Sequence, residues 1–371
     1  MRGAREKMES AGSGGEGGSS APKGLKSGGN HHDWDNHHHR HYSGLAVRIT
    51  VLFVTVGIIY VVLNQSAYPT KFLQNSFSFM SDQSIPSPAI NKENDLENTL
   101  KRAAMKDNKT VIITTLNAAW TEPNSIFDLF LEGFRIGNQT ENLLNHVVVV
   151  ALDQKAYSRC LEVHHHCYAL TTAGIDFSGE AHFMSEDYLK MMWRRIDFLR
   201  IVLELGYNFV FTDADVMWLR DPFQRFFPDG DFQIACDHYW YNYTDLENSP
   251  NGGFNYVKSN NRTIQFYKFW YAGKDYFPGK HDQDVLNMIK FDPFIKDIGL
   301  EIRFLDTAYF GGFCEPSKDL DLVITMHANC CIGLENKLHD IKMVIDDWKR
   351  YMSSRDRNLK TRSWTVPRIC G

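Results

Sequence analysis

The chain has 371 residues, of which 43% are hydrophobic and 13% aromatic, so it can bury a large core in one domain or in two. Its formal net charge at pH 7 is -5, and no basic stripe with interleaved aromatic residues occurs along it. These properties argue against nucleic acid as a partner.

The N-terminal part divides into three segments of different composition. Residues 1–44 are rich in Gly, Ser and His, which predicts a disordered cytosolic tail, although its histidine-rich run could bind a transition metal. Residues 45–63 are almost entirely apolar and long enough to cross a bilayer as one helix. Residues 64–108 are polar, contain Pro86 and Pro88, and are expected to form a stem that ends in a helix at 93–105.

The charge distribution around the apolar segment predicts how it inserts. Lys and Arg are frequent before it, whereas the stretch after it, up to residue 90, contains a single lysine. The positive-inside rule therefore places the N-terminus in the cytosol. N-glycosylation sequons at Asn108, Asn138, Asn242 and Asn261 and all seven cysteines follow the segment. We expect a single-pass type II membrane protein whose remaining residues lie in the secretory lumen.

The cysteines predict disulfides but not their partners. Cys160 and Cys167 could close a short loop, yet the pairing cannot be read from the sequence. An odd count leaves at least one cysteine unpaired or intermolecular. Paired Cys-x-x-Cys spacing does not occur, so a zinc site is not expected.

Alternating strands and helices follow the stem. Ser125 and Asp153 are expected to cap the helices after them, and Gly137 and Gly206 to end the helices before them. This alternation predicts an α/β domain with a mostly parallel sheet and helices on both faces. The predicted elements are strands at 111–116, 146–152, 209–211, 232–236, 254–258 and 322–327, a loop at 117–120, a turn at Gly252-Gly253, and helices at 126–135, after Asp153, and at 185–205, 263–271, 282–289 and 335–350.

Two carboxylates, Asp213 and Asp215, follow the short apolar strand at 209–211. In an open α/β sheet, ligands bind beyond the C-terminal ends of the strands. Two carboxylates there repel each other unless a cation or a proton lies between them. Oxygen ligands suit Mg²⁺ or Mn²⁺, and such an ion would neutralise a departing diphosphate. The alternative is a solvated turn without a ligand.

Five short motifs occur in the order found in a known family. They are residues 111–117 (Val-Ile-Ile-Thr-Thr-Leu-Asn), 211–216 (Phe-Thr-Asp-Ala-Asp-Val), 251–254 (Asn-Gly-Gly-Phe), 282–287 (Asp-Gln-Asp-Val-Leu-Asn) and 327–331 (His-Ala-Asn-Cys-Cys). With these motifs, residues 109–348 resemble the plant nucleotide-diphospho-sugar transferases of glycosyltransferase family 77. The resemblance implies a GT-A-like single domain over residues 109–371 with a Rossmann-like mixed, mostly parallel sheet, in a Golgi membrane protein whose catalytic domain is luminal.

The resemblance also implies roles for charged residues. Asp213, Asp215 and His327 would hold Mn²⁺ or Mg²⁺, and Asp213 would also lie at the donor diphosphate. Arg195 and Lys337 would contact phosphate. The alternatives are a core histidine for His327 and a solvated helix face for each of the two cations.

The remaining candidates would lie near the base, the ribose or the sugar of the donor. These candidates are Thr115 and Asn117 for base and ribose, Asn251, Gly252 and Gly253 for the sugar, and Asp282, Gln283 and Asp284 for catalysis at the anomeric carbon. The alternatives are strand-end capping for the residues after the first strand, a hairpin turn for the glycines, and helix capping for the acids near residue 282.

The implied function is that of a metal-dependent retaining glycosyltransferase. It would move a sugar, with a pentose as one candidate, from a nucleotide-sugar donor expected to be UDP-linked to a cell-wall glycan or glycoprotein. The acceptor would attack from the same face or after a short-lived enzyme adduct.

One alternative is a haloacid-dehalogenase-like phosphatase with Asp213 as nucleophile and Asp215 as general acid, although Met217 stands where that pattern expects Thr or Val. Another is a non-catalytic luminal glycan-binding scaffold.

Overall fold

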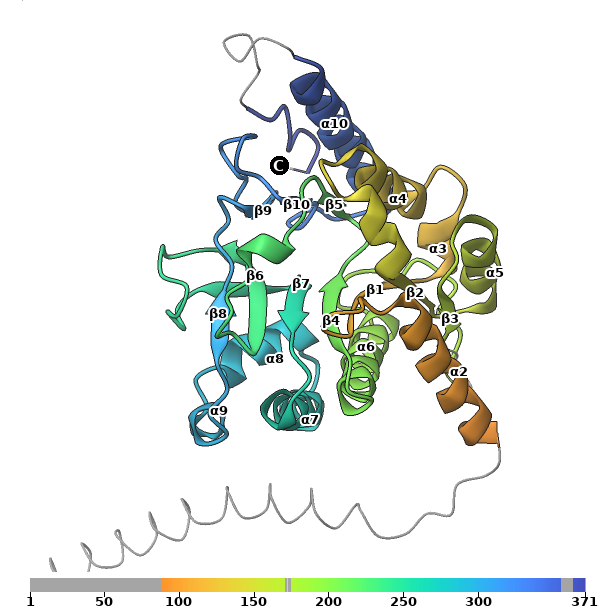
Figure 1. Ribbon diagram of the computed structural model, residues 1–371, viewed down its shortest axis with the longest axis vertical. Helices are drawn as coiled ribbons and strands as arrows, with labels where there is room; N and C mark the ends of the chain where they lie inside the picture. Colours follow the sequence, from red (N-terminus) through yellow and green to blue (C-terminus); the bar gives the residue numbers. More distant parts are fainter. Residues whose placement is uncertain (1–87, 171, 173–174, 355–362, 371) are drawn as a thin grey trace, which may run out of the picture. The chain divides into compact units, whose positions relative to one another are not determined.

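The computed structural model describes residues 88–170, 172, 175–354 and 363–370, which belong to one compact unit (Figure 1). The predicted tail, the membrane helix at 45–63 and the first part of the stem lie outside these residues. Within the described ranges, no helix is both long and apolar enough to cross a membrane. Helix α2 (Pro88–Ala103), at the end of the predicted stem, buries Leu96 and Leu100 in the same apolar cluster as the first strand.

A seven-stranded sheet runs through the centre of the unit in the order β3-β2-β1-β4-β7-β6-β8. Its first four strands are parallel, β7 is antiparallel to both β4 and β6, and β8 is parallel to β6. The sheet is therefore mixed and mostly parallel, as predicted. The strands are β1 (Thr110–Leu116), β2 (Val147–Ala151), β3 (Cys167–Ala169), β4 (Asn208–Thr212), β6 (Phe232–His238), β7 (Ser249–Val257) and β8 (Ile302–Phe304).

Helices cover both faces of this sheet. Alternate residues of each strand point to opposite faces and therefore pack against different helices. In β1, Ile112 packs in a cluster with residues of α4 and α10, whereas Val111 and Ile113 pack with residues of α2, α6 and α7. The helices are α3 (Ala118–Thr121), α4 (Ile126–Ile136), α5 (Gln154–Val163), α6 (Glu186–Glu204), α7 (Asn261–Tyr276), α8 (Asp282–Ile289), α9 (Pro293–Asp297) and α10 (Leu334–Ser353), with 3-10 turns at Glu141–His146 and Phe223–Arg225.

A second, three-stranded sheet holds β10 (Thr325–His327) between β5 (Val216–Trp218) and β9 (Phe310–Gly312). Strand β10 runs antiparallel to β5 and pairs His327 with Val216. It runs parallel to β9 and pairs His327 with Gly312. This small sheet brings a late part of the chain against the turn that follows β4.

Several helix boundaries agree with the sequence. Asp153 accepts from the backbone N–H of Ala156 and caps α5 as predicted. Ser185 accepts from the backbone N–H of Tyr188 and caps α6, although no cap was predicted for that helix. Gly206 has a φ of 82°, a conformation that glycine adopts without a Cβ penalty. Ser125 is at the N-cap position of α4, but its side chain makes no capping hydrogen bond.

Two local predictions are wrong. The loop predicted at 117–120 is mostly helix α3, because the Asn117 side chain caps it by accepting from the N–H of Trp120. The turn predicted at Gly252-Gly253 is also wrong, since both glycines lie inside strand β7. A glycine within a strand marks a close approach of other groups, and the groups involved here belong to the site described below.

Trp218 supports the turn between β4 and β5 from within the core. The residue is fully buried, stacks on Phe134 with ring centroids 4.7 Å apart, and donates its indole N–H to Thr212 Oγ1 at 3.1 Å. We predict that Trp218→Ala lowers the free energy of unfolding by about 3–5 kcal/mol in urea denaturation, because it leaves a large cavity. Trp240, which is 53% exposed, gives the control: Trp240→Ala should change it by no more than about 0.5 kcal/mol. Equal losses in the two variants would contradict this packing.

Candidate metal and donor site

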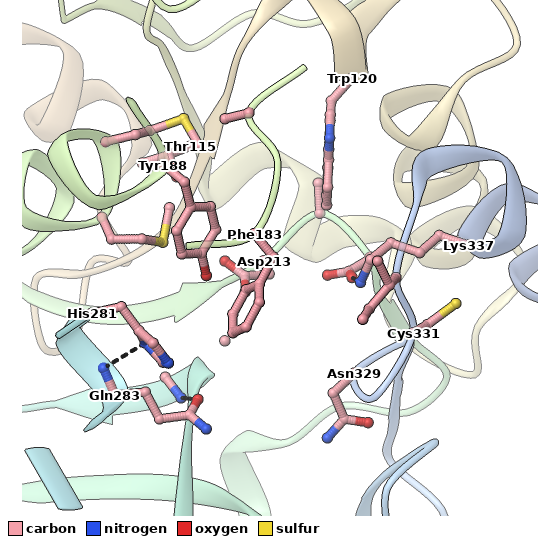
Figure 2. A pocket seen from close by; sticks show the side chains of 18 of the residues that line it. Thr115, Trp120, Phe183, Tyr188, Asp213, His281, Gln283, Asn329, Cys331 and Lys337 are labelled. Carbon is pink, nitrogen blue, oxygen red and sulfur yellow. Dashed lines mark hydrogen bonds and ion pairs between the residues drawn. The ribbon is translucent and has the colours of Figure 1, made fainter. Parts of the chain in front are cut away.

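A cavity of about 610 Å³ opens beyond the C-terminal ends of β1 and β4 (Figure 2). Its walls come from the segments after these strands, from α6, from the middle of β7, from the start of α8 and from the segment between β10 and α10. This is the edge where ligands bind in open α/β sheets. The five sequence motifs, far apart along the chain, all contribute residues to it.

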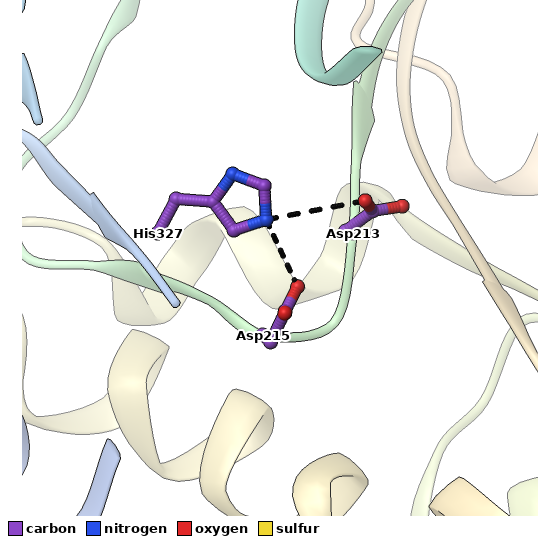
Figure 3. A group of neighbouring side chains, drawn as sticks. All are labelled: Asp213, Asp215 and His327. Atoms are coloured by element: carbon purple, nitrogen blue, oxygen red, sulfur yellow. Dashed lines mark ion pairs between the residues drawn. The ribbon is translucent and has the colours of Figure 1, made fainter. Parts of the chain in front are cut away.

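Asp213, Asp215 and His327 lie together in this cavity (Figure 3). Each offers one ligand atom, and these atoms all lie within 4.8 Å of one another. His327 Nε2 is 3.2 Å from Asp215 Oδ1 and 4.0 Å from Asp213 Oδ2. The backbone holds this arrangement, since the N–H of Asp213 donates to Gly253 O and the N–H of Ala328 donates to Asp215 O. The structure thus brings the three predicted metal ligands together.

The chemistry of these groups fits a divalent cation. Asp215 is 2% exposed, and its Oδ1 accepts no hydrogen bond with good geometry from any described residue. Burial and the neighbouring Asp215 carboxylate raise the pKa of Asp213, although Arg195 opposes them. Burial would also raise the pKa of Asp215, but Lys337 and His327 outweigh it and hold this pKa well below its usual range. Two carboxylates and one imidazole are suitable ligands for Mg²⁺ or Mn²⁺.

Gly253 leaves the space that this cluster needs. A Cβ at this position would lie 2.4 Å from His327 Cε1 and 2.6 Å from Asp213 Oδ2. At Gly252, the nearest atom to a Cβ would be Arg195 Nη2 at 3.6 Å, an ordinary contact distance. The close approach of β7 to the metal ligands therefore requires glycine at 253 and not at 252.

Arg195 connects the metal cluster to helix α8. Its Nη1 donates to Asp213 Oδ1 at 2.9 Å, and its Nη2 donates to Asp282 Oδ2 at 2.5 Å. The guanidinium is buried and lies 4.8 Å from the centre of the Phe211 ring. Burial would raise the pKa of Asp282, but Arg195 and His281 outweigh it and lower this pKa. Arg195 lines the cavity, as expected of a phosphate-binding residue, but in this structure its charge compensates two carboxylates.

Lys337, at the start of α10, also reaches the metal cluster. Its Nζ donates to Asp215 Oδ2 at 2.5 Å and to Ala328 O at 2.7 Å. The same ammonium group lies 5.9 Å from the centre of the Trp120 ring, on the cavity wall. Its predicted role at a donor phosphate stays a prediction.

The three predicted catalytic residues do not share one environment. Asp282 and Gln283 line the cavity, whereas Asp284 is not among the described residues of the lining. The Asp284 side chain is 40% exposed and lies 3.5 Å from His281 Nε2. Successive helical residues point in different directions, so α8 presents Asp282 and Gln283 inward and Asp284 outward.

Thr115 and Asn117 also line the cavity, at the end of β1. The amide group of Asn117 is occupied by the fold, because Nδ2 donates to Phe177 O and Gly179 O while Oδ1 accepts from Trp120 N. Capping thus accounts for Asn117. Contact of these two residues with a nucleotide stays a prediction.

Several residues of the cavity wall had no predicted role. Asp237 and Asn329 are polar lining residues, and Trp120, Phe183 and Tyr188 are aromatic ones. Two of them carried a signal in the sequence. Asn329 lies inside the His-Ala-Asn-Cys-Cys motif, and Asp237 follows the predicted strand at 232–236, as Asp213 follows its own strand.

Disulfides fix the segment that follows His327. Cys330 is bonded to Cys314 and Cys331 to Cys370, while Cys160–Cys167 closes the short loop considered above and Cys236 is a free, buried thiol. The C-terminal residues are anchored in turn by buried Asp340, whose carboxylate accepts from the backbone N–H groups of residues 368–370. One wall of the cavity is therefore covalently attached to the C-terminal segment.

The space left by Gly253 gives a direct test of the metal cluster. We predict that Gly253→Ala lowers the affinity for Mn²⁺, titrated by calorimetry, by about 10-fold or more, because the methyl group displaces a ligand. Gly252→Ala is the matched control, since neither glycine has a positive φ and its methyl group has room. It should keep the affinity within about threefold. Similar affinities for both variants would contradict the proposed ligands.

Comparison with known proteins agrees with this geometry. A model of the nucleotide-diphospho-sugar transferase family matches residues 142–341. An uncharacterized protein of Arabidopsis thaliana is 55% identical over 273 residues, which cover 73% of this chain and 72% of that protein. A second uncharacterized protein of that plant is 42% identical over 290 residues, covering 74% of this chain and 87% of that protein.

A more distant relative has a named activity. The UDP-D-xylose:L-fucose alpha-1,3-D-xylosyltransferase of Arabidopsis thaliana is 29% identical over 184 residues, which cover 49% of this chain and 47% of that enzyme. The family predicted from the five motifs is confirmed by the match of its model to more than half of the chain. The chain is an enzyme that belongs to the nucleotide-diphospho-sugar transferase family.

Proposed function

We propose that the protein transfers a pentose from a UDP-sugar to a glycan or glycoprotein of the cell wall, with retention of anomeric configuration, and that the reaction depends on Mn²⁺ or Mg²⁺. The observation that carries the proposal is the Asp213–Asp215–His327 cluster in the cavity, in which Asp215 and His327 are buried. Family membership supports the nucleotide-sugar donor and argues against the phosphatase alternative. The pentose and the UDP group rest on the printed name of the xylosyltransferase relative.

The charged residues around the metal cluster suit a reaction in which a diphosphate leaves. Asp213, Asp215 and His327 would hold the ion, which when bound neutralises the leaving diphosphate. The bond between the anomeric carbon and the diphosphate oxygen breaks with its electrons going to the diphosphate. The acceptor oxygen forms the new bond and passes its proton to the departing diphosphate. Lys337 Nζ, 2.5 Å from Asp215, is close enough to the ion site to contact the diphosphate.

The sugar is proposed to lie against the part of the cavity wall that β7 and α8 form together. Gly252 adds no side chain to this wall, and Asp282 and Gln283 lie beside it. Asp282 is 1% exposed and paired with Arg195, so its lowered pKa keeps it ionised. A fixed carboxylate beside the anomeric carbon would stabilise positive charge that develops as the leaving group departs.

We also propose a Golgi location with the described unit in the lumen. The proposal rests on the apolar segment at 45–63 and on the basic residues before it. Three disulfides in the described unit are consistent with an oxidising compartment.

A donor assay tests the proposed function. We predict that the purified protein releases UDP from one or more UDP-pentoses with Mn²⁺ and not with excess EDTA. Asp215→Ala should lower this rate by about 100- to 1000-fold, the loss typical when a group that stabilises developing charge is removed. Asp275→Ala, an exposed change on α7, should keep the wild-type rate. Activity that persists in EDTA, or no UDP release from any UDP-sugar, would contradict the proposal.

A further inference from the structure

Asp237, near the end of β6, organises one side of the cavity. Its carboxylate accepts hydrogen bonds from three side-chain amides, each at 2.8 Å: Asn251 Nδ2 and Asn329 Nδ2 donate to Oδ1, and Gln283 Nε2 donates to Oδ2. The sulfur of Cys314 lies 3.3 Å from Oδ1, but it is part of a disulfide and has no proton to donate. The carboxylate therefore joins β7, α8 and the segment after β10.

Each of the three amides is also held at its carbonyl end. Gln283 Oε1 accepts from the backbone N–H of Gly252 at 3.0 Å, and Asn251 Oδ1 accepts from that of Gly253 at 2.9 Å. Asn329 Oδ1 accepts from the N–H of Cys314 at 3.1 Å. Because a carboxylate only accepts and a backbone N–H only donates, the orientation of every amide is determined.

We propose that Asp237 is a positioning residue for sugar transfer, which acts by fixing the amide of Gln283 with its NH₂ group toward Asp237 and its carbonyl oxygen toward Gly252. The inference rests on the proposed function, because it places Gln283 beside the donor sugar. Gln283 and Asn329 both lie at the bottom of the cavity as Figure 2 draws it, and both donate to Asp237. Fixing the amide in advance removes the cost of orienting it during the reaction.

The two carboxylate oxygens of Asp237 have separate partners, so one substitution can address Gln283 alone. Asp237→Asn can keep Oδ1 for Asn251 and Asn329 while its new NH₂ group replaces Oδ2. That NH₂ group then faces the NH₂ group of Gln283, and two donors cannot bond to each other. The amide of Gln283 must rotate or move, while the metal ligands keep their contacts.

The test measures kcat, KM for the active UDP-sugar, the affinity for UDP with Mn²⁺, and Tm for wild type, D237N, Q283A and the double variant. We expect D237N to lower kcat by about 10- to 100-fold, as loss of a supporting contact to a functional group does. KM and the UDP affinity should stay within about threefold. D275N makes the same chemical change at an exposed site of α7 and should match wild type in all four measurements.

The double variant separates positioning from a structural role. If Asp237 acts through Gln283, the double variant loses no more kcat than Q283A alone. Losses that multiply, or a D237N enzyme with wild-type kcat, would overturn the inference. A wild-type protein that releases no UDP from any donor would instead overturn the proposed function.

A second pair of variants covers the case in which D237N alone does not fold. In the exchanged pair D237N/Q283E, the amide introduced at position 237 can donate to the carboxylate introduced at position 283. The inference predicts that this pair has a higher kcat than Q283E alone, in which two carboxylates face each other. An equal or lower kcat would contradict it.

Discussion

The site depends on the balance of charge buried in one cavity. Among the residues that the structure describes, the carboxylates of Asp213, Asp215 and Asp282 lie beside two cations, Arg195 and Lys337. With these five groups ionised and the histidine neutral, one negative charge remains, and the Asp237 carboxylate in the same cavity adds a second. A buried charge is costly unless it is paired, so a divalent cation at the aspartates would complete the balance. The same ion pairs connect α6, α8 and α10 to the turn after β4, which makes the charge balance a feature of the fold as well as of the site.

The small sheet and strand β7 give this cluster its geometry. The small sheet places His327 opposite Val216, so that a late strand delivers an imidazole to the turn between β4 and β5. Strand β7 passes close to the other side, where only a hydrogen atom at Gly253 fits beside His327 and Asp213. The strand then continues toward Gly252 and Asn251, which contact Gln283 and Asp237. Metal site and proposed sugar site are therefore parts of one backbone arrangement.

The sequence predicted the parts of this arrangement that have local signals. Apolar periodicity and capping residues predicted α6, and helix α8 has the predicted bounds of 282–289. The motifs predicted that Asp213, Asp215 and His327 share one site, and in the structure one ligand atom from each lies within 4.8 Å of the others. Strands β5, β9 and β10 are only three residues long, and their pairing is determined by distant partners. Asp237 lies outside the five motifs. Its role depends on three amides that only the fold brings to it, so the sequence did not predict that role. The glycines at 252 and 253 indicated a turn. This prediction was wrong because a sequence does not show which groups approach a glycine.

The central claim is that Asp213, Asp215 and His327 hold a divalent cation for a nucleotide-sugar donor. Anomalous X-ray diffraction at the manganese edge tests it most directly, on crystals grown with Mn²⁺ and UDP. The account predicts one strong anomalous peak bonded to the two aspartates and to His327 Nε2, with the diphosphate on its open side. A peak elsewhere in the cavity, or UDP bound at this site without any manganese signal, would contradict it.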